Sequence, residues 1–163
     1  VTLQALLDQA RCNVQLDVGY GDAVTPDPKE IEYPTMLDDL PRPRLRVYPR
    51  ETVFAEKLEA MQVLGRANTR MKDYFDLLAL AREGAMDPQN LADAMRATFR
   101  RRGTPLPEGL PFGLTRAFGE DEAKRLQWAA FVRRNQLDAP PLEDVFQELA
   151  QFVREPLNRS RQQ

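Results

Sequence analysis

The segment from Glu51 to Leu64, ETVFAEKLEAMQVL, constrains the fold more than any other part of this 163-residue chain. When its residues are projected at about 100° per residue, the apolar and polar side chains fall on opposite sides. The apolar side holds Val53, Phe54, Leu58, Ala60, Met61 and Leu64, and the polar side holds Glu56, Glu59 and Gln62. This pattern predicts an amphipathic helix that ends near Gly65 and packs against a core.

Lys57 breaks this pattern, because it lies near the middle of the apolar stripe. A buried ammonium is costly unless it meets an anion. One interpretation is that Lys57 extends to solvent or pairs with a structural carboxylate such as Glu51 or Glu56. The other is that it lies at the floor of a cleft and meets an anionic ligand.

Composition narrows the possible chemistry. Hydrophobic residues make up 42% and charged residues 29% of the chain, as in an ordinary globular domain, and no apolar run is long enough to span a membrane. Cys12 is the single cysteine and histidine is absent, so a disulfide framework, a histidine general base and most zinc sites are excluded. A reducing cytoplasm is the simplest expected location.

Strands are predicted before the long helix and further helices after it. The clean alternation of NVQLDVGY predicts a half-buried strand, and an abrupt apolar run before it suggests a short helix. The predicted N-terminal elements are a helix at Leu3–Ala10 and strands at Asn13–Tyr20, near Ile31–Tyr33 and at Leu45–Tyr48. The predicted later helices are Arg70–Arg82, a helix capped by Asp87 that ends at Gly103, Glu120–Asn135 and Pro141–Arg154, with a Pro/Gly-rich crossover at 104–119 and a frayed tail.

This order predicts an α+β fold, with a small N-terminal sheet followed by a helical bundle. We expect residues 1–50 to form the sheet region and residues 51–163 the helical domain, packed together as one unit. Two or three strands make a poor sheet. An exposed sheet edge also invites pairing with a second chain, so a homodimer is a possible assembly.

A group of charged residues lies at the start of the helix that follows the lysine helix. Arg70 and Asp73 are three residues apart, as are Asp73 and Asp76, so together with Lys72 they form one charged edge. Carboxylates in a first helical turn also suit the helix dipole, so this edge is either an ordinary helix start or part of a site. Asp17 is likewise either a solvated strand residue or a functional carboxylate.

Four segments of the chain resemble, in the right order, successive motifs of the abortive-infection toxin family of nucleotidyltransferases (AbiEii type, the toxins of type IV toxin–antitoxin systems). They are LDVGYGDAV, YPRETVFAEKLEAM, NTRMKDYFDLLAL and ATFRRRGTPLP. The Ala-Glu-Lys and Arg-x-Lys-Asp-x-x-Asp-Leu elements are the more specific parts. The family resembles the DNA polymerase β superfamily, so the resemblance implies that the small sheet is a remnant of a nucleotidyltransferase sheet. It also implies transfer of a nucleotidyl group from a nucleoside triphosphate (NTP) to an acceptor, and some relatives act on the 3′ end of tRNA.

The resemblance assigns roles residue by residue. Lys57 and Asp73 would be catalytic, with Lys57 meeting the triphosphate, and Asp17 would be a metal ligand on a central strand. The other implied nucleotide-binding positions are Arg70, Lys72 and Asp76. In this chemistry carboxylates hold two Mg²⁺ ions against the triphosphate, and a fixed cation neutralises charge on the leaving pyrophosphate.

One part of the superfamily pattern is missing. The chain has no Gly-Ser turn, and nothing before Asp17 supplies the expected acidic pair, since Asp8 stands alone. We therefore expect the strand with those ligands to lie before residue 1, the chain to be the C-terminal part of a longer parent, and the chain alone to be inactive. The expected cofactor and partners of that parent are Mg²⁺, an NTP, a tRNA or other RNA acceptor, and an antitoxin that needs no direct contact, with no role for a membrane.

Two other functions stay open at this stage. The chain could be a non-catalytic helical protein-interaction module or a degenerate relative that binds nucleotide without turnover. The enzyme interpretation predicts that Asp17, Lys57 and Asp73 converge on one pocket, whereas the interaction module predicts that they lie apart. A run of arginines at 100–102 is interpreted as a solvated helix end, with an RNA-backbone contact as the alternative.

Overall fold

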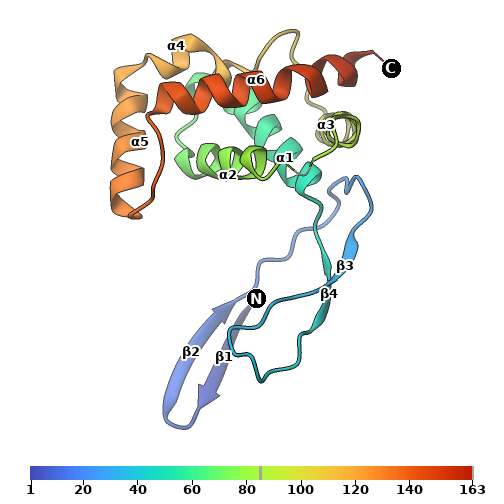
Figure 1. Ribbon diagram of the computed structural model, residues 1–163, viewed down its shortest axis with the longest axis vertical. Coiled ribbons are helices and arrows are strands. Elements are labelled where there is room, and N and C mark those ends of the chain that lie inside the picture. The colour runs from blue at the N-terminus through green and yellow to red at the C-terminus, as the bar shows by residue number, and fades with distance from the viewer. Residues whose placement is uncertain (85, 163) are drawn as a thin grey trace.

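The computed structural model describes residues 1–84 and 86–162. Figure 1 shows two strand hairpins, in blue and cyan, that project from a bundle of helices. The strands are β1 (Thr2–Leu7), β2 (Ala10–Gln15), β3 (Lys29–Glu32) and β4 (Arg44–Val47). β1 pairs antiparallel with β2, and β3 pairs antiparallel with β4, as two separate sheets. The strands precede the helices in the chain, so the predicted α+β class is confirmed.

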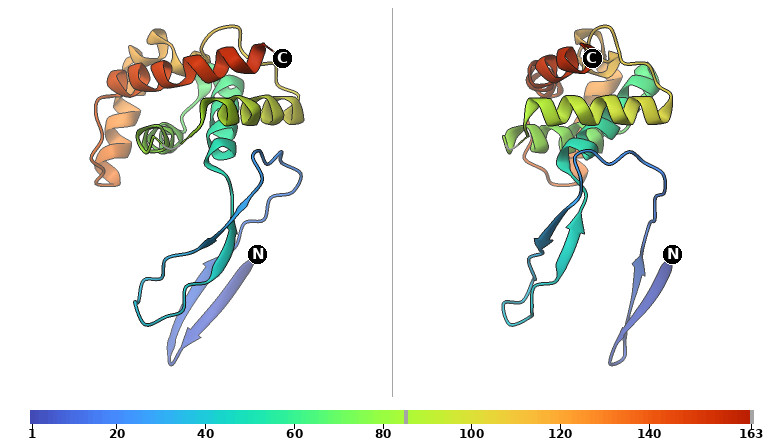
Figure 2. Two further views of the ribbon diagram at one scale, coloured as in Figure 1. Left: turned by 45° about the vertical axis from the view of Figure 1, so that its right-hand side comes forward. Right: turned by 90° about the vertical axis from the view of Figure 1, so that its right-hand side faces the viewer.

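The helical part begins directly after β4. Its helices are α1 (Arg50–Leu64), α2 (Met71–Arg82), α3 (Pro88–Arg102), the short α4 (Arg116–Gly119), α5 (Glu122–Arg134) and α6 (Leu142–Arg161). Single 3₁₀ turns occur at η1 (Gly65–Ala67) and η2 (Phe112–Leu114). In Figure 2 the bundle stays at one end of the molecule in both views, with the hairpins extending away from it. No helix in the described ranges is long and apolar enough to cross a membrane. The division at residue 50 into two domains stays a prediction.

The apolar stripe of α1 forms the centre of the bundle. Phe54, Leu58 and Met61 are fully buried and belong to one cluster with apolar side chains of α2, α3, α5 and α6. Burial of each such side chain contributes about 1.5–3 kcal/mol. The projection is wrong at two positions. Leu64 is exposed at the end of the helix, and Glu59 is buried because α3 covers it.

The ends of the later helices follow their sequence signals unevenly. Asp87 caps α3 by accepting hydrogen bonds from two backbone N–H groups, and Gly103 ends it with a left-handed φ of 67°, as predicted. The prediction of a frayed tail is wrong, because α6 continues to Arg161. Buried Pro156 and Leu157 extend the apolar face of α6 past Arg154, and this packing keeps the last turns helical.

The N-terminal hairpin differs most from its prediction. Residues expected to form a helix form β1, because Asp8 adopts a positive φ of 49° and reverses the chain in a two-residue turn. The predicted strand Asn13–Tyr20 stops at Gln15. Its predicted half burial is also wrong, since Val14, Val18 and Tyr20 are all exposed.

Side-chain hydrogen bonds tie the second hairpin and the loop before it to α1. Thr52 Oγ1 accepts from the backbone N–H of Thr25 at 2.9 Å and donates to the Thr25 carbonyl at 2.7 Å. The Tyr48 hydroxyl donates to Glu56 at 2.5 Å. These contacts fix where the chain enters α1, and thereby the rotation of the helix that carries Lys57.

Candidate functional site

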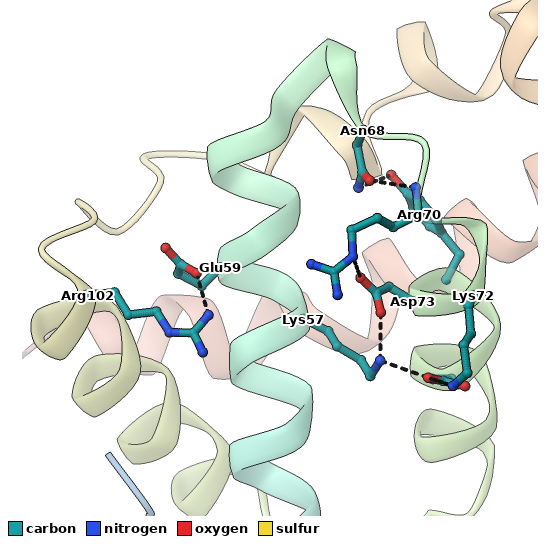
Figure 3. A network of polar contacts seen from close by, with 9 residues as sticks. Lys57, Glu59, Asn68, Arg70, Lys72, Asp73 and Arg102 are labelled. Carbon is teal, nitrogen blue, oxygen red and sulfur yellow. Dashed lines mark hydrogen bonds and ion pairs between the residues drawn. The ribbon is translucent and has the colours of Figure 1, made fainter. Parts of the chain in front are cut away.

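Lys57 extends from α1 toward α2 and meets two carboxylates (Figure 3). Its Nζ lies 2.7 Å from Asp73 Oδ1 and 2.8 Å from Asp76 Oδ2. The Asp73 side chain is 5% exposed and that of Lys57 is 18% exposed, so the pair is held mostly away from solvent. The two helices place these groups together because Asp73 and Asp76 are three residues apart on the face of α2 that meets α1.

Two further cations surround this pair from α2 and its cap. Lys72 Nζ lies 2.6 Å from Asp76 Oδ2. Arg70 Nε lies 2.8 Å from Asp73 Oδ2, but in an orientation that leaves this buried oxygen without a hydrogen bond. We call Lys57, Arg70, Lys72, Asp73 and Asp76 the lysine cluster. Three cations face two carboxylates in it, so it carries one net positive charge, and Arg70 and Lys72 are largely exposed.

The ion pairs favour the charged forms of Lys57 and Asp76. Burial alone would lower the pKa of Lys57, but the carboxylates of Asp73 and Asp76 raise that pKa above its ordinary value overall. Burial alone would raise the pKa of Asp76, but Lys57 and Lys72 lower it overall. Lys57 therefore already carries its positive charge before an anionic ligand arrives.

A second lysine supports the loop before α2, and the sequence interpretation missed it. Lys124 of α5 is buried, and its Nζ donates to the Asn68 carbonyl at 2.7 Å. The side chain of Asn68 accepts in turn from the backbone N–H of Arg70 at 2.9 Å. The signal that could have revealed Lys124 is the one that revealed Lys57, since Lys124 lies at helical spacing from the buried Trp128. These contacts position the start of α2, which carries Arg70 and Lys72.

The structure does not bring Asp17 to the lysine cluster. Asp17 lies beyond the end of β2 in an exposed segment, and its described side-chain contact is with Gln15 Nε2 at 3.0 Å. The prediction that it converges with Lys57 and Asp73 is therefore wrong for this chain, because the strand expected to carry it inward is uncovered. Glu51 and Glu56 do not pair with Lys57 either in the described contacts.

The carboxylates within the described ranges do not fit a magnesium site. They include no group of three or more acidic residues placed to hold a metal ion. Asp73 and Asp76 are already engaged by three cations, and two Mg²⁺ ions require several oxygen ligands each. No chemical step through a metal follows from these residues.

Two of the arginines at the end of α3 make contacts within the protein that the sequence did not predict. Arg102 donates to buried Glu59 at 2.9 Å and lies 3.3 Å from Asp22, so burial of Glu59 is matched by a cation. Arg101 donates to the carbonyl of Gly21. All three arginines are exposed, as the interpretation as a solvated helix end requires, but Arg102 also neutralises the buried carboxylate of Glu59.

A comparison with known protein families matches most of the chain. Residues 1–151 match the family described as nucleotidyl transferase AbiEii toxin, type IV TA system. The match covers both hairpins and the lysine cluster. No curated protein and no solved structure matches the chain. Because the family model matches most of the chain, the chain belongs to the AbiEii family of nucleotidyl transferase toxins of type IV toxin–antitoxin systems.

Proposed function

We propose that the lysine cluster binds the triphosphate of an NTP whose nucleotidyl group is transferred to an RNA acceptor, with tRNA as the expected acceptor. The observation that carries the proposal is the ammonium of Lys57, which α1 holds inside an apolar stripe and two aspartates keep charged. A cation that is positioned before the reaction stabilises charge developing on the leaving pyrophosphate without reorganisation.

The exposed members of the cluster give the triphosphate a route to that ammonium. Arg70 and Lys72 are 57% and 72% exposed, so both can turn from their aspartates toward phosphate oxygens. Asp73 would then keep Lys57 in place, as a positioning residue, while phosphate contacts the remaining N–H group of Lys57. An ammonium has three N–H donors, and two of them face Asp73 and Asp76. The third is available to a ligand.

The wider function follows from the family and stays part of the proposal. The full-length parent would use Mg²⁺ with carboxylates besides those gathered here, since these do not fit the ions. Asp17 would join them only in that larger assembly, and the 163-residue chain alone would be inactive in transfer. We further propose a cytoplasmic protein that blocks translation, is neutralised by an antitoxin without required contact, and can form a homodimer through its strand edges.

Label transfer by the full-length parent tests this function. The parent is incubated with Mg²⁺, tRNA and each NTP labelled in turn, with the Lys57→Ala variant in parallel. Lys29→Ala is the matched control, because Lys29 lies exposed on β3. We expect transfer by the parent and the control and a loss of at least a hundredfold in Lys57→Ala. Transfer that Lys57→Ala leaves unchanged would contradict the proposal, and the cluster would then be a structural ion-pair network.

A further inference from the structure

A cavity opens directly beside the lysine cluster, between the start of α2 and α5. It has a volume of about 570 Å³, and its lining includes Arg70, Lys72 and Asp73 on the α2 side and Gln127, Ala130 and Phe131 on the α5 side. Three cluster residues thus form one wall. The opposite wall carries no charge. The α2 wall carries two cations and one carboxylate, so a ligand that spans both walls would place an anionic end there and a neutral end against α5.

The neutral wall includes an aromatic side chain that packs against two other rings. The Phe131 ring lies 6.3 Å from that of Phe75 on α2 and 5.8 Å from that of Trp128. Phe131 is only half-buried, so part of its side chain remains available from the cavity. Nucleobases of every type can stack on an accessible aromatic side chain, because each base has a π-face.

Gln127 adds an unused hydrogen-bonding group to the same wall. Its Oε1 is buried and has no hydrogen-bond partner among the described residues. An unsatisfied buried polar group costs about 1–3 kcal/mol of stability, and such a group calls for an explanation in a native protein. Rotation of the amide about its last side-chain bond would turn a donor or an acceptor toward the cavity, and the edge of a base offers both.

We propose that this cavity binds the nucleobase of the NTP, with the base on Phe131, its edge against the Gln127 amide, and the phosphates over the lysine cluster. The proposal rests on the proposed function, since it extends the same site from triphosphate to base. Its separate content is that the 163-residue chain recognises a nucleoside, and not only a polyphosphate. Cavities of 300–1,000 Å³ are of the size that small ligands fill.

Titration calorimetry on this chain with the four NTPs and with inorganic tripolyphosphate tests the proposal. We expect at least one NTP to bind tenfold or more tightly than tripolyphosphate, although tripolyphosphate carries more charge. Gln127→Met should weaken that NTP about tenfold, leave tripolyphosphate unchanged, and leave the thermal midpoint equal or higher because it removes the unpaired oxygen. Phe131→Leu should likewise weaken the NTP alone. Gln151→Met, on an exposed face of α6, is the matched control and should change neither affinity.

The outcomes separate the two proposals. Equal binding of NTP and tripolyphosphate, or an NTP affinity that Gln127→Met and Phe131→Leu leave unchanged, overturns the base site and leaves the phosphate site standing. Equal weakening of NTP and tripolyphosphate by these variants also overturns it, because the effect then acts on the phosphate end. Absence of binding by both ligands overturns the base site together with the proposed role of the lysine cluster in this chain.

Discussion

Removal of the Lys57 ammonium should destabilise the fold mainly by leaving Asp73 unpaired. Lys57→Met keeps most of the side-chain volume, so little packing is lost. Asp73 is 3% exposed, and removing one partner of a buried ion pair costs about 3–5 kcal/mol. The cost here should be smaller, about 2–3 kcal/mol, since Lys57 is not fully buried and Arg70 remains beside Asp73.

A double variant separates the lost charge from the lost contact. Lys57→Met combined with Asp73→Asn removes both charges, so its free energy of unfolding should return to within about 1 kcal/mol of the wild type. Urea denaturation followed by circular dichroism measures the wild type, both single variants and the double variant, with equal slopes as a check that the unfolded states are comparable. A cost below about 0.5 kcal/mol for Lys57→Met, or a double variant as unstable as the sum of the singles, would refute the reasoning.

The other predictions concern pH, packing and capping. Lys57 and Lys72 lower the pKa of Asp76 despite its burial. The contribution of Asp76 to the free energy of unfolding is therefore present above the pKa of the unfolded state and is lost as pH falls below about 4. Asp76→Asn should flatten this part of the plot of stability against pH, and an unchanged plot would contradict the ion pairs. Gly119→Ala should cost about 1–3 kcal/mol, because its new Cβ would overlap the ring of buried Phe146; a thermal midpoint equal to that of the wild type would contradict this packing. Asp87→Ala should cost about 1 kcal/mol by removing the cap of α3, and calorimetric unfolding checks it.

Local signals in the sequence predicted the helical part of the fold well. The apolar stripe of α1, the Asp87 cap and Gly103 are all short-range features that survive tertiary packing. The strands were harder, because a strand's burial depends on what covers it. The alternation around Asp17 predicts one buried face, yet the apolar side chains of that segment are exposed. A two-residue turn at Asp8 converted an apparent helix into a hairpin.

The candidate site was predictable in part for the same reason. Lys57 stood out because helical periodicity alone places it in an apolar stripe, and its partners lie on one short edge of the next helix. Lys124 was missed because its acceptor is a backbone carbonyl 56 residues away in the chain. Gln127 was missed because an unsatisfied amide can be recognised only when its surroundings are known.

The measurement that tests the central claim most directly is the affinity for tripolyphosphate of the Lys57→Met/Asp73→Asn double variant. This variant loses one positive and one negative charge, so the net charge of the cluster does not change, and its fold is expected to be as stable as that of the wild type. If Lys57 is held in place to bind phosphate, calorimetry at fixed ionic strength should show at least a tenfold loss of affinity. An affinity equal to that of the wild type, in a variant of equal stability, would show that Lys57 is a structural cation and would contradict the account.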